Sequence, residues 1–351
     1  MLKKIFKKLL YVYWIILLLL VSFELSPKAI SYKKDNPWIN ESKRPWIIPH
    51  GGAKALYPEN TILAFKETAH YDVFEVDLTL TKDDILISHH DLDIRHDLLL
   101  QDLSDDLLVR NLTYQEIIDQ IQLADYPYAR SFVDPDGLMP YAGTTDQAVL
   151  DLLLPQTLES LFDTYPNKMF ILELKDLTNE SEDTFSIAAN ELLSLISAYD
   201  MADHVMVSSF DDAVITYFRS ISEGKIHTSA ASNETLKVVL MSAFSLDFFY
   251  QPKDAALAMP VGERLSEGQI NLIRMLPKRI QTRIMRQENG VYYTELIQKT
   301  LIDDLSRHNM ASIYWTVNDI EEMKQLIALD VDGIITDRPD LLEQVLLELG
   351  L

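Results

Sequence analysis

The sequence predicts an α/β fold, a TIM-type (β/α)8 barrel, because short apolar runs alternate with longer segments of helical periodicity. About eight such units fit a region of this length, which favours a closed barrel over an open doubly wound sheet. Neither a glycine-rich dinucleotide loop nor a Walker loop is present, which counts further against an open-sheet nucleotide-binding fold. The 351-residue chain is long enough to bury the core of one such barrel.

Composition narrows the function classes before any motif is considered. Hydrophobic residues make up 48% of the chain and charged residues 24%, which is typical of a folded globular protein. The formal net charge is -23 and we recognise no basic patch in the folded region, which argues against a nucleic-acid partner. The chain has no cysteine, which excludes disulfides, thiolate zinc sites and a cysteine nucleophile.

Residues 1–30 are predicted to form a signal anchor and linker outside the fold. Lysines cluster within residues 3–8 and precede an uncharged apolar run at residues 9–23. By the positive-inside rule, this order predicts a single-pass protein of the cell membrane with its folded region outside the cytoplasm. The run is shorter than the ~20 residues of a full span, so secretion after cleavage is the alternative. Residues 24–30 offer no convincing small-x-small cleavage site, which favours the uncleaved anchor helix.

Residues 45–351 are predicted to form the barrel itself. Strands are expected in the β-rich runs, at residues 46–50, 73–80, 85–90, 169–174, 205–208, 311–317 and 333–336. Helices are expected at residues 61–69, 184–199, 211–222, 234–243, 294–307, 321–329 and 341–349, the first with Asn60 as its N-cap.

Residues 92–154 break this alternation. They contain no clear strand, and Asp, Tyr, Pro and Gly cluster at residues 125–128 and 133–143. We interpret the segment as an insertion on one barrel loop, long enough to form a lid over a site. Tyr and Leu recur through it, which argues against a disordered excursion.

Two acidic residues stand on the strand expected at residues 73–80. Glu75 and Asp77 are two positions apart, so both project to one side, and in a barrel alternate residues point into the centre. Two converging carboxylates near the mouth of a barrel are costly without a cation. Oxygen ligands favour a hard ion, so we expect one divalent metal, Ca²⁺ or Mg²⁺.

The order of several short motifs resembles the glycerophosphodiester phosphodiesterase family. The resemblance begins with His50-Gly51-Gly52, Pro58-Glu59-Asn60-Thr61, Glu75-Val76-Asp77 and His89-His90-Asp91. It continues through residues 171–175, 208–210, 314–318 and 332–339, so it runs in order from about residue 47 to the C-terminus.

The resemblance implies roles for five residues of the reaction centre. His50 and His90 correspond to a general acid and base pair, because an imidazole pKa lies near working pH. Glu75, Asp77 and Glu173 correspond to the ligands of the divalent metal. The nucleophile it implies is the neighbouring hydroxyl of the substrate's own glycerol, which gives a cyclic phosphate intermediate.

The resemblance also implies supporting residues. Lys175 would add positive charge at the phosphate, and Trp315 would form an apolar wall for the glycerol moiety. Glu59 and Asn60 would orient the loop around the site. His89 alternates away from His90 along the strand, so we interpret it as a packing histidine without a catalytic role.

One position departs from the family pattern. The family usually has Arg directly after the first histidine, where a guanidinium can clamp a phosphate oxygen, and this chain has Gly51. Lys54 of the same loop is a candidate substitute, and its alternative is a solvated loop charge. The space left by a glycine could also receive a larger head group.

The resemblance therefore predicts hydrolysis of small or lipid-derived glycerophosphodiesters to glycerol 3-phosphate and an alcohol. Two alternatives stay open. The first is a lysophospholipase D or sphingomyelinase D-like enzyme, which predicts an apolar channel for an acyl chain. The second is a catalytically impaired module that binds glycerophosphate ligands, motivated by Gly51.

Overall fold

The computed structural model describes residues 2–25, 35–102, 104–176 and 184–351. In this described part, eight parallel strands form two hydrogen-bonded arcs. One arc has the order β2-β4-β5-β6, with β2 Val73–Leu80, β4 Met169–Leu174, β5 Val205–Ser208 and β6 His227–Thr228. The other has the order β1-β11-β10-β7, with β1 Trp46–Pro49, β11 Gly333–Thr336, β10 Ala311–Trp315 and β7 Ala256–Pro260.

The two arcs meet on both sides, so the strands close into a barrel. A parallel bridge joins Ser229, just after β6, to Ala256 of β7, and the amide of Ala230 donates to the carbonyl of Ala256 at 3.0 Å. On the other side, the amide of Gly51, just after β1, donates to Glu75 on β2 at 2.7 Å. This arrangement confirms the prediction of a TIM-barrel-like α/β fold.

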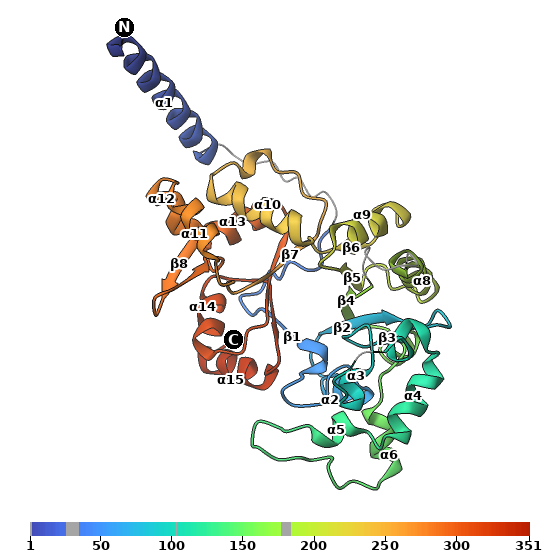
Figure 1. Cartoon of the computed structure of the whole chain (residues 1–351). Helices are drawn as coiled ribbons and strands as arrows, with labels where there is room; N and C mark the ends of the chain where they lie inside the picture. The colour runs from blue at the N-terminus through green and yellow to red at the C-terminus, as the bar shows by residue number, and fades with distance from the viewer. Residues whose placement is uncertain (1, 26–34, 103, 177–183) are drawn as a thin grey trace.

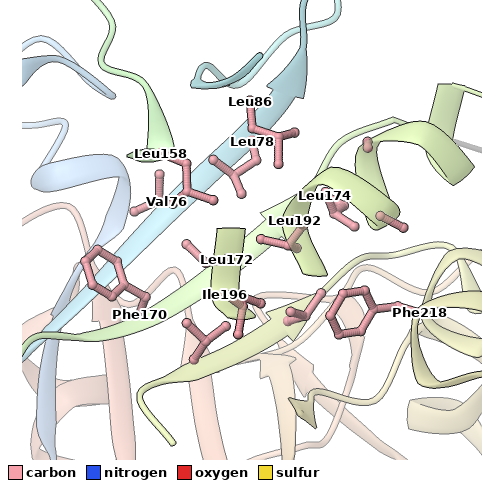
Figure 2. Close-up of a cluster of buried hydrophobic side chains, with 14 of the residues drawn as sticks. Val76, Leu78, Leu86, Leu158, Phe170, Leu172, Leu174, Leu192, Ile196 and Phe218 are labelled. Carbon is pink, nitrogen blue, oxygen red and sulfur yellow. The ribbon is translucent and has the colours of Figure 1, made fainter. Parts of the chain in front are cut away.

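Helices cover the outside of the strands (Figure 1). They are α2 Ile62–Glu67, α7 Leu158–Thr164, α8 Thr184–Ala198, α9 Asp212–Ile221, α10 Ser232–Ala243, α13 Lys299–Arg307, α14 Ile320–Ala328 and α15 Pro339–Leu349. Figure 2 shows side chains of β2 and β4, such as Val76 and Leu172, packed with Leu192 and Ile196 of α8. Burial of such side chains is the main force that holds helices to the sheet.

Most of the predicted helices and strands are confirmed, and three of the predictions need correction. The N-cap of α2 is Thr61, whose hydroxyl accepts from the amide of Ala64, so the expectation for Asn60 is wrong. The strand expected at residues 85–90 is β3 Leu86–Ser88, an antiparallel partner of β2 and not a barrel strand. The helix expected from residue 294 begins only at Lys299, because residues 291–294 pair in a hairpin.

The segment between β3 and β4 is helical and packs around its own apolar cluster. It contains α3 Arg95–Leu98, η2 Asp105–Leu107, η3 Val109–Asn111, α4 Tyr114–Leu123, α5 Pro127–Ser131, α6 Gln147–Leu150 and η4 Asp151–Leu153. Ile94, Ile117 and Leu153 of this segment are buried together with Ile87 of β3. The described residues of this segment, 92–102 and 104–154, thus form a cap joined to the barrel. The domain boundaries stay a prediction.

A second excursion leaves the barrel after β7. It contains α11 Glu267–Arg274, α12 Lys278–Ile284 and the antiparallel hairpin of β8 Met285–Glu288 and β9 Val291–Thr294. Neither this excursion nor η5 Asp247–Phe249, β6 and β7 before it was predicted from the sequence. A strand as short as His227–Thr228 has too few residues to show a period.

An N-terminal strap closes the end of the barrel at which the strands begin. Asn36 donates to the carbonyl oxygens of Ala255 and Asn309 at 2.7 and 2.8 Å. Trp38 is fully buried in the cluster that fills the barrel interior. Because this end is plugged, substrate access is left to the opposite end, where the strands finish.

The first helix, α1 Leu2–Leu25, has 24 residues and projects from the rest of the molecule in Figure 1. Within the ranges that the structure describes, no helix has both the length and the apolar character required to cross a membrane.

Candidate active site

His50 follows β1 directly, at the end of the barrel where the strands finish. Its Nδ1 lies 2.7 Å from Oδ1 of Asp337, the residue after β11. Burial lowers the pKa of His50, but the Asp337 hydrogen bond and the Glu75 charge outweigh it and raise that pKa. Asn318 donates to the other Asp337 oxygen at 2.6 Å. An imidazole held through Nδ1 in this way directs Nε2 away from Asp337, which suits proton transfer.

Glu75, Asp77 and Glu173 bring carboxylate oxygens within 4.8 Å of one another. Asp77 and Glu173 are register partners on neighbouring strands β2 and β4, and Glu75 stands two residues earlier on β2. Burial, followed by the charge of Asp77, raises the pKa of Glu75 to about 8. Burial and the charge of Asp77 also raise the pKa of Glu173. The predicted cluster is therefore assembled, and it is electrostatically costly as it stands.

Lys175 joins two members of this cluster. Its ammonium lies 2.8 Å from Asp77 Oδ1 and 2.8 Å from Glu173 Oε1. Burial raises the pKa of Asp77, but the Lys175 charge and hydrogen bond outweigh it and lower that pKa. With all groups ionised, the carboxylates of Glu75, Asp77 and Glu173 and the ammonium of Lys175 leave a charge of -2. An all-oxygen site of this charge fits a hard divalent cation.

His90 follows β3 and is half exposed, with 47% of its side-chain surface accessible. Its Nδ1 lies 2.7 Å from Asp91 Oδ1, and this hydrogen bond is the main cause that raises the pKa of His90. The charges of Asp77 and Glu59 also raise it, whereas that of Lys175 lowers it. His90 therefore adjoins the carboxylate cluster on the Asp77 side, as His50 does on the Glu75 side.

His89 is a buried packing histidine, as expected. Its Nδ1 lies 2.7 Å from the carbonyl oxygen of Asp91, and its Nε2 lies 2.7 Å from Asp97 Oδ2 on α3. Burial lowers the pKa of His89, but the charge and hydrogen bond of Asp97 raise it to about 9. Both ring nitrogens are thus engaged in fastening α3 to the end of β3.

The loop after β1 is held against the cluster. The side-chain amide of Asn60 donates to Asp77 Oδ2 at 2.8 Å, and the Asn60 backbone amide donates to the Gly51 carbonyl at 2.8 Å. Gly51 has a φ of +52°, which favours glycine. A Cβ on Gly51 would lie 3.4 Å from Asn60 Nδ2 and 3.4 Å from Glu59 Cβ. A side chain at Gly51 would thus contact Asn60 and Glu59, and the use of this position by a larger head group stays a prediction.

Lys54 lies on the same loop as His50. Its backbone amide donates to the His50 carbonyl at 3.2 Å, and its ammonium lies 3.9 Å from Glu59 Oε2. The Lys54 charge lowers the pKa values of both His50 and Asp337. This cation therefore acts electrostatically on the His50 side of the site, although no guanidinium follows the histidine.

Trp315 ends β10 and contacts an aromatic ring that the sequence analysis did not single out. The rings of Trp315 and Phe210 meet edge to face with centroids 5.4 Å apart. Phe210 follows β5 and is 52% exposed. The two rings form an apolar wall at the same end of the barrel as His50, since both strands finish there.

A pocket lies between His90 and the inserted segment. Polar side chains dominate the barrel side of its lining, and the insertion contributes apolar and aromatic side chains together with His96 and Asp97. It is lined by Glu59, Asn60, Thr61, Ser88, His89, His90, Asp91, His96, Asp97, Ile121, Tyr126, Tyr128, Ala129, Leu153 and Pro155. The rings of Tyr128 and His96 are 4.2 Å apart, which fixes part of this lining. The insertion thus borders the site, and its role as a lid stays a prediction.

Three contributors were missed as site residues by sequence reasoning: Asp337, Asn318 and Phe210. Each lies within a motif that had been recognised, but only as a part of the barrel framework. Their position directly after strands β11, β10 and β5 was the usable signal, because functional side chains of such barrels gather where strands finish.

Comparisons with known proteins agree with this geometry. The glycerophosphoryl diester phosphodiesterase family profile matches residues 50–341. A glycerophosphodiester phosphodiesterase of Bacillus altitudinis is 25% identical over 296 residues, which cover 84% of this chain and 95% of the relative. The chain's fold is similar to the glycerophosphoryl diester phosphodiesterase domain of a Mycobacterium tuberculosis protein, with a TM-score of 0.60, 15% identity and coverage of 87% and 99%.

A phosphodiesterase of Oleispira antarctica, solved in complex with the product sn-glycerol-3-phosphate, has a TM-score of 0.51 and 15% identity. The structural match covers 96% of that protein and 86% of this chain. Since the family profile spans the loop of His50, the carboxylate cluster and the final barrel strand, the match includes every part of the site. The chain belongs to the glycerophosphoryl diester phosphodiesterase family.

Proposed function

We propose that this enzyme hydrolyses glycerophosphodiesters to sn-glycerol 3-phosphate and an alcohol, with His50 and His90 as its acid and base. One observation carries the proposal: two imidazoles, each held through Nδ1 by a carboxylate, lie close enough to one carboxylate cluster for its charges to raise their pKa values. The Glu75 charge acts on His50, and the Asp77 charge acts on His90. Such a pair can remove a proton on one side of a phosphate and supply one on the other.

Glu75, Asp77 and Glu173 are proposed to hold one divalent cation, Ca²⁺ or Mg²⁺. Burial, and after it the charge of Asp77, raises the pKa of Glu75 to about 8, so an ionised Glu75 is unfavourable without a cation beside it. When bound, the cation would neutralise charge on the phosphate oxygens. Lys175 already spans two of these ligands and is placed to contribute a further positive charge to the phosphate.

The proposed reaction has two steps. One imidazole takes the proton of the glycerol hydroxyl next to the phosphodiester as that oxygen bonds to phosphorus. The other gives a proton to the leaving alcohol as its P–O bond breaks, and a cyclic phosphate results. Water then opens the ring with the imidazole roles reversed, so both histidines return to their starting protonation. Asp337 and Asp91 orient the rings throughout.

A small polar alcohol is the leaving group that the site favours. The pocket beside His90 is lined by polar side chains of the barrel and by apolar and aromatic side chains of the insertion, so it is not the wholly apolar channel that the lysophospholipase D alternative predicts. The complex of the Oleispira antarctica enzyme with sn-glycerol-3-phosphate supports the same product. The alternative of an impaired binding module has less support, because both histidines and all three cluster carboxylates are in place.

Product analysis tests the proposal. The full chain is incubated with a panel of glycerophosphodiesters and lysolipids, with Ca²⁺, with Mg²⁺ or with chelator. Release of sn-glycerol 3-phosphate, lost in His50→Ala and in His90→Ala and suppressed by chelator, is the expected result. Turnover confined to lysolipids would replace the proposal with the lipid phosphodiesterase, and binding without turnover would replace it with the binding module.

The location outside the cytoplasm is also a proposal. It is supported by the lysine cluster before the apolar run of residues 9–23. Protease treatment of intact cells should digest the folded region, and mass spectrometry of the mature chain should find residues 1–30 retained. A chain protected in intact cells would contradict the location, and a shortened mature chain would indicate secretion after cleavage.

A further inference from the structure

One segment of the surface has a charge opposite to that of the chain as a whole. Residues 268–287 contain five basic residues and no acidic residue, whereas the rest of the chain contains 26 basic and 54 acidic residues. The segment comprises nearly all of α11, all of α12 and most of β8, in the excursion after β7. The expectation that the folded region has no basic patch is therefore wrong here.

The connection between α11 and α12 presents apolar side chains among these cations. Leu272 and Met275 are 63% and 76% exposed, and residues three apart share one side of a helical turn. Arg274, Lys278 and Arg279 are exposed beside them. We name residues 272–279 the docking turn. Single exposed apolar residues are common on protein surfaces. Two neighbouring ones among several basic residues, on a chain that is otherwise acidic, indicate an interaction site.

The docking turn is held in place by contacts with the rest of the protein. Ile273 is buried, with 8% of its surface exposed. Gln281 donates to the carbonyl oxygen of Leu276 at 2.8 Å, which fixes the connection between the helices. Arg283 donates to Ser245 Oγ at 3.0 Å and so ties α12 to the end of α10. The apolar tips are therefore presented on a supported turn, and little conformational entropy is lost when a surface covers them.

We propose that the docking turn binds the surface of an anionic phospholipid bilayer. Leu272 and Met275 would enter the boundary between head groups and acyl chains, where apolar side chains are stabilised. Lys278 and its neighbouring arginines would meet the anionic head groups, each strengthening binding about fivefold. Outside this segment and α1, which has four lysines of its own, the chain contains 53 acidic and 22 basic residues. An anionic surface repels that part, so within the folded region this turn is the part that approaches it.

Charge also argues against DNA or another extended polyanion as the partner of the docking turn. A polyanion follows several rows of cations, and beyond this short segment it would run along an acidic surface. Exposed Leu272 and Met275 have no role in contacts with a phosphate backbone. A planar bilayer touches only the projecting turn, and it alone gives those two side chains an apolar partner.

The absence of cysteine allows a direct test on the full chain. Met275→Cys and, as a matched control, Leu123→Cys each receive an environment-sensitive fluorophore. Leu123 is 90% exposed and lies at the end of α4, outside the basic segment. Phosphatidylglycerol vesicles should shift the emission at position 275 to shorter wavelength and leave position 123 unchanged. Phosphatidylcholine vesicles should give a much smaller shift at position 275.

A charge variant tests the electrostatic part. Lys278→Glu, combined with the label at Met275→Cys, should weaken the vesicle response about tenfold in lipid concentration. Lys225→Glu, at another exposed lysine, should leave it unchanged. Because the label reports its own surroundings, vesicle binding through α1 would not imitate the result. The proposal is overturned by vesicle-bound protein without a shift at position 275, by equal shifts at both positions, or by a response to a DNA duplex in place of vesicles.

Discussion

At the scale of single residues, the site depends on a partner that orients each imidazole. The partner of His50 is Asp337, 287 residues away in sequence, and Asn318 holds that carboxylate from its other oxygen. The partner of His90 is its own neighbour Asp91. The two histidines are therefore not equivalent: one depends on barrel closure, and the other on a local contact.

Replacing Asp337 with Asn should lower kcat at least about 10²-fold with little change in KM, because His50 loses the carboxylate that orients it. Asp337 raises the pKa of His50, so the limb of the pH–rate profile that reports His50 should move to lower pH in the variant. Steady-state kinetics across pH measures both effects. Asp340→Asn, at a carboxylate paired with Arg338, is the control and should behave as the parent. An unchanged kcat in Asp337→Asn would refute the positioning role.

Lys54 is expected to act on the phosphate where the family usually has an arginine. Its side chain is 35% exposed, and its charge influences both His50 and Asp337. Lys54→Ala should lower kcat/KM about tenfold, the usual worth of one charged hydrogen bond, and Lys54→Arg should restore most of it. Lys66→Ala, at an exposed lysine on α2, should have no effect. Equal activity of Lys54→Ala and the parent would assign Lys54 to a solvated loop charge.

At the scale of elements, the insertion is fastened to the barrel by buried polar contacts as well as by apolar packing. His89 at the end of β3 binds Asp97 on α3, directly beside the catalytic candidate His90. The same contact fixes the first helix of the segment that borders the pocket. The position of the lid is thus linked to the backbone that carries His90.

This contact predicts a pH-dependent stability. The pKa of His89 in the folded protein, about 9, lies above the ordinary value of 6.5. The contribution of protonated His89 to the free energy of unfolding is therefore complete below pH 6.5. It is lost as pH rises through about 9, and a shift of this size corresponds to ~3 kcal/mol. Denaturant unfolding of His89→Gln should show a smaller decline in stability between these pH values. His70→Gln, at an exposed histidine, should decline like the parent. Parallel curves for His89→Gln and the parent would contradict the assignment.

At the scale of the whole molecule, the barrel gathers like charges at one end. The carboxylates of Glu75, Asp77 and Glu173 lie together in a chain of net charge -23, and Lys175 offsets part of their charge. Folding without a cation must therefore overcome this repulsion. A cation that binds the folded state and not the unfolded chain stabilises the fold.

Ca²⁺ or Mg²⁺ should raise the thermal midpoint of the full chain. An ion present at ~100 times its dissociation constant adds ~3 kcal/mol to the free energy of unfolding. Glu173→Gln removes one ligand charge and should abolish most of that increase. Glu348→Gln, at an exposed position of α15, is the matched control and should respond like the parent. Thermal unfolding with each ion or with chelator is the measurement. A midpoint independent of both ions would remove the metal from the proposal.

Sequence periodicity predicted the barrel strands only where a run was long enough to show it. Strand β2, with eight residues, and β4, with six, were recognised, while the two-residue β6 was not. The excursion of α11, α12 and the β8–β9 hairpin was missed for a different reason. It packs on the outside of the barrel, so its sequence follows no regular alternation with the barrel strands.

By itself, the sequence determined the barrel class, the carboxylates of β2 and the two candidate histidines, because these follow from strand alternation and from motifs read over a few residues. Only the tertiary structure decided which groups meet. Asp337 reaches His50, Asn60 reaches Asp77 and Phe210 meets Trp315 because barrel closure places the ends of distant strands side by side. Alternation assigns a side chain to a face of its strand, whereas its partner depends on which strands are neighbours.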